Sequence, residues 1–446
     1  MNEMMITNKE GRGLTNSKGE KSLGVLPLSA IDIVNRGLSK RYRRERRFRC
    51  YGLLAIAVSL CFLSMMFISI IGKGYRAFQQ TFIRLEVHVD PDIVNEASMA
   101  DADYARILKN AMTALFPEVR DRSGKRKLWG LVSSGADYQV RKMVLHNTRI
   151  IGSTVSLWVP ADDTVDMWAK GHFRKVTGSE GDGPLSRQEL SWIERLQTEG
   201  RLETRFNTVF FTGGDSREPE LAGIWGAVVG SFFMLIVTLA LSFPIGVAAA
   251  VYLEEFASTN FWSDLIEVNI NNLAAVPSIV FGLLGLAVFL NFFGMPRSAP
   301  LVGGLVLTLM TLPTIIIAGR AALQAVPPSI REAALAVGAS KMQTVLQHVI
   351  PLALPGMLTG TIIGMARALG ETAPLLMIGM VAFIVDIPGG LLDPATALPV
   401  QIYLWADSPE RAFVEKTSAA TMILLGFLIT MNAAAVILRR RFERRW

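Results

Sequence analysis

The chain changes from polar to apolar on a scale of tens of residues rather than residue by residue. Apolar stretches long enough to cross a bilayer recur six times, and we expect spans at 51–71, 223–253, 271–293, 301–318, 356–380 and 419–438. A helix needs roughly 20 apolar residues to cross the hydrocarbon core. The pattern therefore predicts an all-α polytopic membrane protein with six transmembrane helices. Pro244 lies within the second span and should kink it, and Pro277 lies within the third.

A long polar segment, 73–221, separates the first span from the other five. Its sequence at 82–90 alternates apolar and polar residues, which is typical of a half-buried strand, and 154–159 and 205–211 read as further strands. Residues 94–116 and 186–200 read as amphipathic helices, the second opened by a capping box of Ser186 and Glu189. We expect a small α+β insert without a site of its own.

Arginines concentrate beside the first and last spans, at 41–49 and 439–445. Because basic flanks stay in the cytoplasm, we expect both termini there, and the first span lacks the form of a cleaved signal peptide. The predicted domains are a basic amino-terminal segment 1–49, a first helix 50–72, an extracytoplasmic insert 73–221, a five-helix core 222–438 with a cytoplasmic segment 321–350, and a basic tail 439–446.

Composition agrees with a membrane protein. Of 446 residues, 51% are hydrophobic and 19% charged, with a mean hydropathy of +0.36. The net charge of +7 comes with arginines placed beside the spans, which argues against nucleic acid as a partner and for a lipid bilayer. Cys50, Cys61 and four scattered histidines predict no metal or cofactor site, and Asp162, Asp163 and Asp166 are better explained as a solvated acidic turn.

The sequence of the segment 321–350 predicts a short helix that is separated from the preceding span. Pro327 and Pro328 should stop the preceding helix, and Ser329 with Glu332 forms the spacing of a capping box for a new one. Ala333, Ala334 and Ala336 give that helix a small surface, Gly338 should interrupt it, and Pro351 should end the structure that follows. Such a helix suits transmission of a push from a partner protein, and an ordinary interfacial loop is an equally good reading of the residues alone.

The fifth span carries charge where lipid-spanning sequence should have none. Gly356, Gly360, Gly364 and Ala368 recur every four residues and predict close packing on one face. Arg367 and Glu371 follow a neighbouring stripe, and a lone arginine at that depth costs roughly 2.5 to 3.5 kcal/mol. Gly370 and Pro374 should loosen the helix around the pair.

A guanidinium at that depth matches the two oxygens of an oxyanion, with no catalytic role for either side chain. Glu371 would hold Arg367 in the empty site and accept a hydrogen bond from a protonated phosphate oxygen, which sulfate lacks. The competing interpretation is an ion pair that only fixes helix register. A GxxxxGK[ST] phosphate loop is absent from this sequence, so we do not expect an ATPase site or enzyme activity in this chain.

Several of these motifs together resemble a known family. EAALAVGA (332–339) with IPLALPG (350–356) resembles the EAA loop of ABC importer permeases, and PIGVAAAVYLEEFA, NNLAAVPSIVFGLLG, LPTIIIAGRAALQAVP and ARALGETAPLL resemble the PstA permeases of bacterial phosphate (Pst) importers. The resemblance covers about 223–438. A short loop is usual in that family where this chain has the insert.

The resemblance implies a type I ABC importer permease fold, in the cell inner membrane, that imports inorganic phosphate. Implied partners are a sister permease of PstC type, two copies of an ATP-binding subunit that hydrolyses ATP, and an extracytoplasmic phosphate-binding protein. Glu332, Ala333, Ala334 and Gly338 would be the ATPase-coupling positions, and Arg367 and Glu371 the polar pair of the phosphate pathway.

Two alternatives remain. The chain could be the sister permease PstC, although the GETAPLL wording favours PstA. It could also be a membrane sensor that reads an external ligand through the insert, but sensors usually carry a cytoplasmic output domain and the largest cytoplasmic segment expected here has about thirty residues.

Overall fold

The structure is a computed structural model, and it describes residues 30–94, 99, 102–172, 184–258, 260–381 and 383–442. The predicted amino-terminal segment before residue 30, the first part of the predicted helix 94–116, and the last four residues of the basic tail lie outside the described residues. The chain divides into two units, 1–66 and 67–446, each described by itself below.

The helix α1 (Ala30–Gly74) contains the first predicted span. Its apolar stretch, within Arg41–Phe78, is long and apolar enough to cross a membrane, and none of that stretch is buried. A helix that exposes apolar side chains all round needs lipid or another apolar partner. The first predicted span is therefore present as an unbroken helix.

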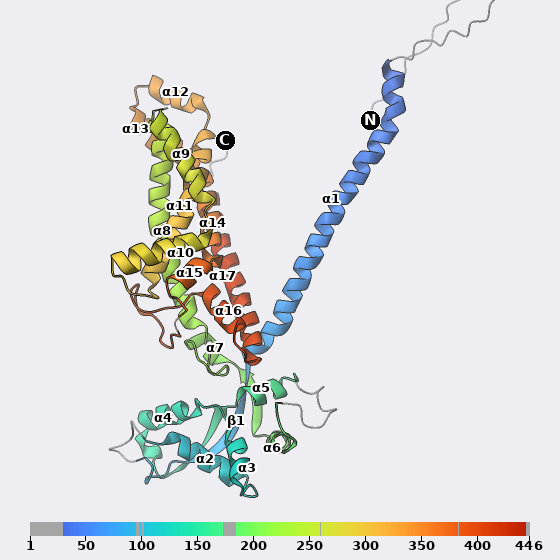
Figure 1. Cartoon of the computed structure of the whole chain (residues 1–446), viewed down its shortest axis with the longest axis vertical. Coiled ribbons are helices and arrows are strands. Elements are labelled where there is room, and N and C mark those ends of the chain that lie inside the picture. Colours follow the sequence, from blue (N-terminus) through green and yellow to red (C-terminus); the bar gives the residue numbers. More distant parts are fainter. Residues whose placement is uncertain are drawn as a thin grey trace, which may run out of the picture. The chain divides into compact units, whose positions relative to one another are not determined.

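The insert is built on a three-stranded antiparallel sheet in the order β2-β1-β3 (Figure 1). The strands are β1 (Gln79–His88), β2 (Thr154–Pro160) and β3 (Leu202–Phe206). Ile83, Leu85 and Val87 of β1 are fully buried, so the predicted alternation is confirmed. The predicted third strand, 205–211, is only partly correct, because the side chain of Asn207 accepts a hydrogen bond from the Phe210 amide and starts a helix.

Helices pack on the buried face of this sheet. They are α2 (Tyr104–Leu115), α3 (Arg122–Trp129), α4 (Ala136–His146), α5 (Asp163–Ala169) and α6 (Arg187–Thr198), followed by α7 (Thr208–Thr212). The predicted capping box of α6 is confirmed: Glu189 donates its amide to the Ser186 hydroxyl, and its carboxylate accepts from the Ser186 amide. The α+β character predicted for the insert is confirmed.

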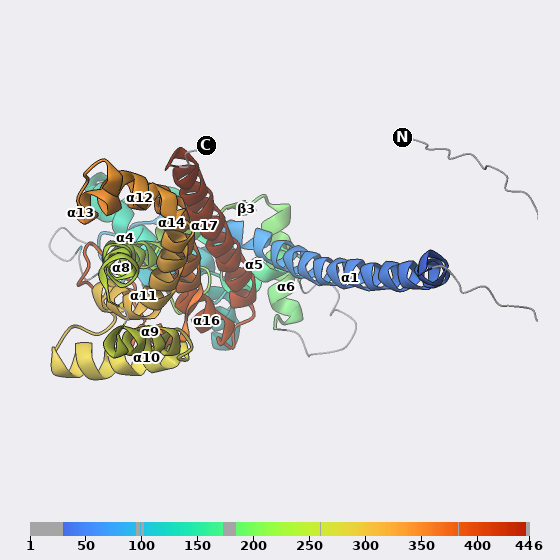
Figure 2. The same ribbon diagram turned by 90° about the horizontal axis from the view of Figure 1, so that it is seen from above.

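The core is a bundle of long apolar helices with shorter helices between them (Figure 1). They are α8 (Trp225–Val251), α9 (Phe261–Ala274), α10 (Ser278–Gly285), α11 (Pro300–Gln324), α12 (Pro328–Ala336), α13 (Lys341–Thr344), α14 (Ile350–Gly370), α15 (Ala373–Met377), α16 (Leu398–Ala406) and α17 (Ala412–Phe442). Figure 2 looks along this bundle and shows α11 between α8 and α14, with α17 beside α14. The described residues contain five helices of spanning length and composition, or six with one bent pair counted as a span.

That bent pair corrects the third predicted span. Residues 271–293 do not form one straight helix, because α9 and the helix that begins at Ser278 meet at 101°. Pro277 sits at the bend with extended backbone, φ −57° and ψ 137°. A proline lacks the amide that would continue the helix and its ring displaces the preceding turn, so the chain changes direction there.

Pro351 corrects a second expectation. It does not end the preceding structure, since α13, a π-helical turn at Val345–Val349 and α14 follow one another directly. Pro351 lies in the first turn of α14, where its missing amide is tolerated, and the wider π-helical turn precedes it.

Small residues set the distances between the core helices. A methyl group added to Gly360 of α14 would lie 2.2 Å from the Cβ of Ala318 on α11, and one added to Gly356 would lie 2.6 Å from that of Ala322. On the other side of α11, a methyl group added to Gly304 would lie 2.6 Å from the Cβ of Val237 on α8. The predicted small stripe is confirmed as the face that packs on α11.

A buried polar junction joins the insert to the core. Lys170 of α5 forms ion pairs with Asp166 at 2.5 Å and with Glu415 of α17 at 3.3 Å, and His172 also contacts Glu415. Lys416 donates from its ammonium to the carbonyl of Ala222. Charges withdrawn from water hold a fixed geometry only when they are paired. The acidic residues predicted as a solvated turn are structural instead: Asp162 caps α5 and Asp166 accepts from the Thr81 amide.

Glu220 and Asp163 lie at the same junction, and both carboxyl groups have raised pKa values. Burial raises the pKa of the Glu220 carboxyl to about 7. The hydrogen bond that it accepts from the Ser133 hydroxyl acts in the opposite direction and is the smaller effect. Burial, with the neighbouring Asp162 carboxylate second, raises the pKa of Asp163 to about 7 as well. The junction therefore changes charge near neutral pH.

Replacing Gly360 by alanine should destabilise the bundle by about 1–3 kcal/mol, because the new methyl overlaps Ala318 and forces α14 away from α11. Thermal unfolding of the purified chain in detergent measures this. Gly426→Ala on α17 is the matched control, because nothing lies within 4 Å of its added Cβ. Equal unfolding temperatures for the two variants would contradict the packing described here.

The free energy of unfolding should fall as pH rises from about 5 to 7. Between the ordinary carboxyl pKa of 4.5 and about 7, the folded chain keeps a proton on Glu220 that the unfolded chain releases. Glu220→Gln should remove about 2–3 kcal/mol of this dependence, whereas Glu194→Gln, an exposed change on α6, should leave it intact. The measurement is the unfolding temperature of each variant in detergent across that pH range. Parallel pH profiles for wild type and Glu220→Gln would contradict the raised pKa of Glu220.

Candidate functional site

Arg367 and Glu371 lie together at the end of α14. The helix ends at Gly370, and Glu371 has extended backbone, φ −79° and ψ 126°, so the predicted loosening near Gly370 and Pro374 is confirmed as a helix end. The pair is not stacked within one helix, as the four-residue spacing suggested. Arg367 Nε still donates to Glu371 Oε1 at 3.4 Å, a long hydrogen bond.

The two side chains differ in exposure. Arg367 is 46% exposed and Glu371 is 20% exposed. Gly360, Gly364 and Ala368 on the same helix are buried against the core, whereas Ile363, one turn before Arg367, is 59% exposed. Arg367 therefore lies on a stripe of α14 beside the glycines that pack on α11, and its half-exposed guanidinium makes one hydrogen bond, to Glu371, among the described residues.

The segment 321–350 forms two short helices and a turn. The predicted capping box of Ser329 and Glu332 is wrong: Pro328 is the first residue of α12, so Ser329 already lies inside the first turn, and within the described residues no side chain caps this helix. A proline at the first helical position supplies the required φ by itself. The capping box of this segment is formed by Ser340 and Gln343 at the start of α13.

Gly338 interrupts the segment as predicted. Its φ of +89° lies in the left-handed region that glycine adopts without strain. Within α12, Glu332 and Ala333 are exposed, whereas Ala334 is buried, so these neighbouring alanines face opposite ways. Val337 is 85% exposed and Leu335 51%, and Met342 and Leu346 continue this apolar surface across the turn. An apolar surface of this kind is typical of a binding interface.

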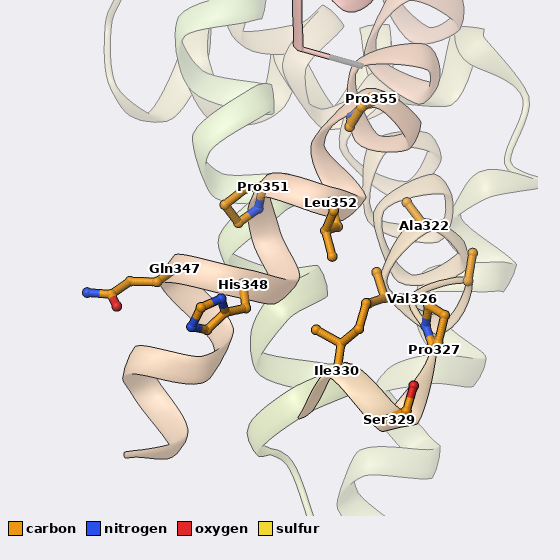
Figure 3. A pocket seen from close by; sticks show the side chains of 11 residues that line it. Ala322, Val326, Pro327, Ser329, Ile330, Gln347, His348, Pro351, Leu352 and Pro355 are labelled. Atoms are coloured by element: carbon orange, nitrogen blue, oxygen red, sulfur yellow. The ribbon is translucent and has the colours of Figure 1, made fainter. Parts of the chain in front are cut away.

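Behind this surface lies a groove of about 680 Å³. It is bounded by the end of α11, by α12 and by the turn that leads into α14, as Figure 3 shows with Ile330, His348 and Leu352 among the labelled side chains. Its lining is mainly apolar and rich in proline. The groove lies between α12 and the start of α14, and α12 also contacts the π-helical turn at Val345–Val349.

The structure does not bring the two sets of candidate residues together. Arg367 lies 17 residues after Ile350 along α14, which at 1.5 Å per residue is about 25 Å. The exposed residues of α12 therefore lie at one end of α14 and the charged pair near the other. One continuous helix connects them.

Sequence reasoning missed one polar contact in this region. Arg331 of α12 forms an ion pair with Glu255, with Nη2 2.5 Å from Oε1. The acidic dipeptide Glu254-Glu255 could have indicated this contact. Two carboxylates at the end of a span are usually paired with basic residues nearby. Among the described residues, no group of three or more His, Cys, Asp or Glu side chains is arranged to hold a metal ion.

Comparison with known proteins places the core in a family. Residues 242–446 match the family of binding-protein-dependent transport system inner membrane components, and residues 35–177 match a domain of unknown function, DUF3333. The chain is 34% identical to the phosphate transport system permease protein PstA 1 of Mycobacterium tuberculosis over 230 residues, which are 51% of this chain and 74% of that protein. It is 30% identical to PstA of Xylella fastidiosa over 50% of this chain and 77% of that protein.

A probable ABC transporter permease of Bacillus subtilis, YqgI, is 36% identical over 37% of this chain and 56% of that protein. Among solved structures, an inward-facing MetNI methionine ABC transporter is 21% identical over 50% of this chain and 98% of that chain, with a TM-score of 0.38. Two of these three relatives carry the PstA name. The chain therefore belongs to the family of binding-protein-dependent transport system inner membrane components, as a PstA-like permease of an ABC importer.

Proposed function

We propose that this chain is the transmembrane permease subunit of an ATP-driven importer of inorganic phosphate. In this proposal it forms the translocation pathway with a sister permease of PstC type and is driven by two copies of a separate ATP-binding subunit. An extracytoplasmic phosphate-binding protein delivers the anion. The protein lies in the cell inner membrane with both termini in the cytoplasm, and the insert 73–221 lies outside.

One observation carries the proposal: a half-exposed guanidinium within an apolar helix. Arg367 makes a single long hydrogen bond to Glu371 among the described residues and keeps its remaining donors open. An arginine that only fixed helix register would be expected to be buried and fully paired. A planar cation on an open helix face suits transient binding of an oxyanion that is later released.

The glutamate adds selectivity to this site. Arg367 Nε and Glu371 Oε1 are 3.4 Å apart, so the hydrogen bond between them is long. An anion can therefore take the place of Glu371 as the partner of Arg367. A carboxylate accepts a hydrogen bond from a protonated phosphate oxygen but repels a fully ionised sulfate. Arg367 therefore attracts the anion and Glu371 discriminates between anions.

The exposed surface of α12 supports the coupling part of the proposal. Glu332, Ala333 and the apolar residues Leu335 and Val337 face outward, and Gly338 ends the helix sharply. We assign the ATP-binding subunit to this surface. Ala334 is buried, so it contributes by holding α12 against the core rather than by touching the ATPase.

Arg367→Ala should lower phosphate uptake by about 100-fold, because it removes the charge-assisted hydrogen bonds to the anion. Uptake of labelled phosphate into proteoliposomes that contain the whole complex measures this. The complex should assemble normally, and Arg411→Ala, an exposed change outside α14, should transport at the wild-type rate. Wild-type uptake by Arg367→Ala would remove that arginine from the pathway.

Glu332→Lys should weaken attachment of the ATP-binding subunit several-fold, because it reverses the charge on the outward face of α12. The fraction of ATPase that co-purifies with the tagged permease is the readout. Glu194→Lys makes the same exchange on the exposed surface of the insert and serves as the control. If both variants retain the full amount of ATPase, this surface is not the docking site.

A further inference from the structure

A short turn after α8 contacts α11, α12 and α13 through its side chains. The turn is π-helical, Tyr252–Phe256, and its last three residues are Glu254, Glu255 and Phe256. Each of the three side chains meets a different basic residue, and these come from α11, α12 and α13. We call these three residues the receiving turn.

The central contact is between Glu255 and Arg331. Arg331 Nε donates to both carboxylate oxygens of Glu255, at 3.1 and 3.3 Å, and Nη2 donates to Oε1 at 2.5 Å. The carboxylate is only 8% exposed. A planar fork that meets a shielded carboxylate in this way defines both distance and orientation.

Arg331 also binds the end of α11. Nη1 donates to the carbonyl of Val326 at 2.8 Å, and Nη2 donates to that of Leu323 at 2.9 Å. The last carbonyls of a helix lack partners within the helix, and a cation there is favourable. One guanidinium thus ties together α12, the end of α11 and the turn after α8.

The neighbouring residues of the turn repeat the arrangement. Glu254 accepts from Arg320 at 3.3 Å and from Gln324 at 3.0 Å, both on α11, and Arg320 reaches Glu267 of α9 at 2.9 Å. The ammonium of Lys341 on α13 lies 5.3 Å from the ring centre of Phe256. Both halves of the 321–350 segment are therefore attached to one turn.

α12 also packs on the π-helical turn Val345–Val349, where Ile330 joins the apolar cluster that contains Val349. Gly338 separates α12 from α13 along the chain, and the groove lies between α12 and the start of α14. Arg331 adds a directional connection, because its partners are Glu255 in the turn after α8 and carbonyl groups at the end of α11. Among the described helices, α8 and α11 pack most extensively together.

We propose that Arg331 is a positioning residue for energy transmission: through Glu255 and the end of α11 it makes α12, α11 and α8 move as one body when the ATPase pushes on α12. This inference rests on the proposed function, because it assumes that the ATPase docks on α12. The receiving turn, rather than the direct chain connection through Gly338, then carries the motion toward the helices that line the pathway.

The first test measures the mechanical link without using transport. Hydrogen exchange of the α12 backbone amides is followed in the purified complex. Arg331→Ala should speed exchange in α12 at least tenfold and leave α14 unchanged, and Arg331→Lys, which keeps one contact to Glu255, should give a smaller increase. Unchanged exchange of α12 in Arg331→Ala would overturn the inference.

The second test measures coupling in proteoliposomes. In Arg331→Ala the ATPase should remain bound and hydrolyse ATP, while the number of ATP molecules consumed per phosphate imported rises at least tenfold. Glu255→Ala should raise the ratio by a smaller factor, because Arg331 keeps its hydrogen bonds to the carbonyls of Val326 and Leu323. The double variant should be no worse than Arg331→Ala, because that change already removes the contact to Glu255. If a truncation prevents folding, Glu255→Gln, which keeps the shape of the side chain, takes the place of Glu255→Ala. Arg411→Ala is the control.

Three results would contradict the inference: a wild-type ratio of ATP to phosphate in Arg331→Ala, loss of the ATPase from that variant, or effects of the two single changes that multiply in the double. A wild-type complex that imports no phosphate would instead overturn the proposed function. In that case the hydrogen-exchange test still decides whether Arg331 holds α12.

Discussion

Close packing of α11 against α8 and α14 is the constraint on which the rest of the core depends. Lipid offers helices no hydrophobic reason to associate, so association requires small residues that let backbones approach. Gly304 meets Val237 on one side of α11, and Gly360 meets Ala318 on the other. This packing occupies the glycines of α14, and Arg367 lies half exposed on the stripe beside them.

The charged residues of the core divide into two kinds by their pairing. Those near the receiving turn are shielded and bound in several directions, as Arg331 is by Glu255 and two carbonyls. Those at the junction with the insert are likewise paired, as Lys170 is with Asp166 and Glu415. Arg367 differs, with one long bond and nearly half of its side chain exposed. A fixed structural role explains the first two groups, and for the third we propose a transient anion.

The features that sequence reasoning predicted correctly depend on periodicity. The glycine stripe of α14, the alternation of β1 and the capping box of α6 each follow from a fixed spacing of residue types. The features that it missed depend on backbone direction or on contacts between distant residues. Average hydropathy over 271–293 does not register the bend at Pro277, and the Ser329/Glu332 spacing fits the interior of a first turn as well as a cap. The pairing of Arg331 with Glu255 joins residues 76 positions apart, which no local pattern reveals.

The central claim is that the open guanidinium serves phosphate in particular, and anion competition tests it most directly. Proteoliposomes that contain the whole complex would be given labelled phosphate with increasing unlabelled phosphate or sulfate. The account predicts that unlabelled phosphate suppresses uptake and that sulfate in large excess does not. Equal suppression by the two anions, or uptake of labelled sulfate at the same rate as phosphate, would contradict it.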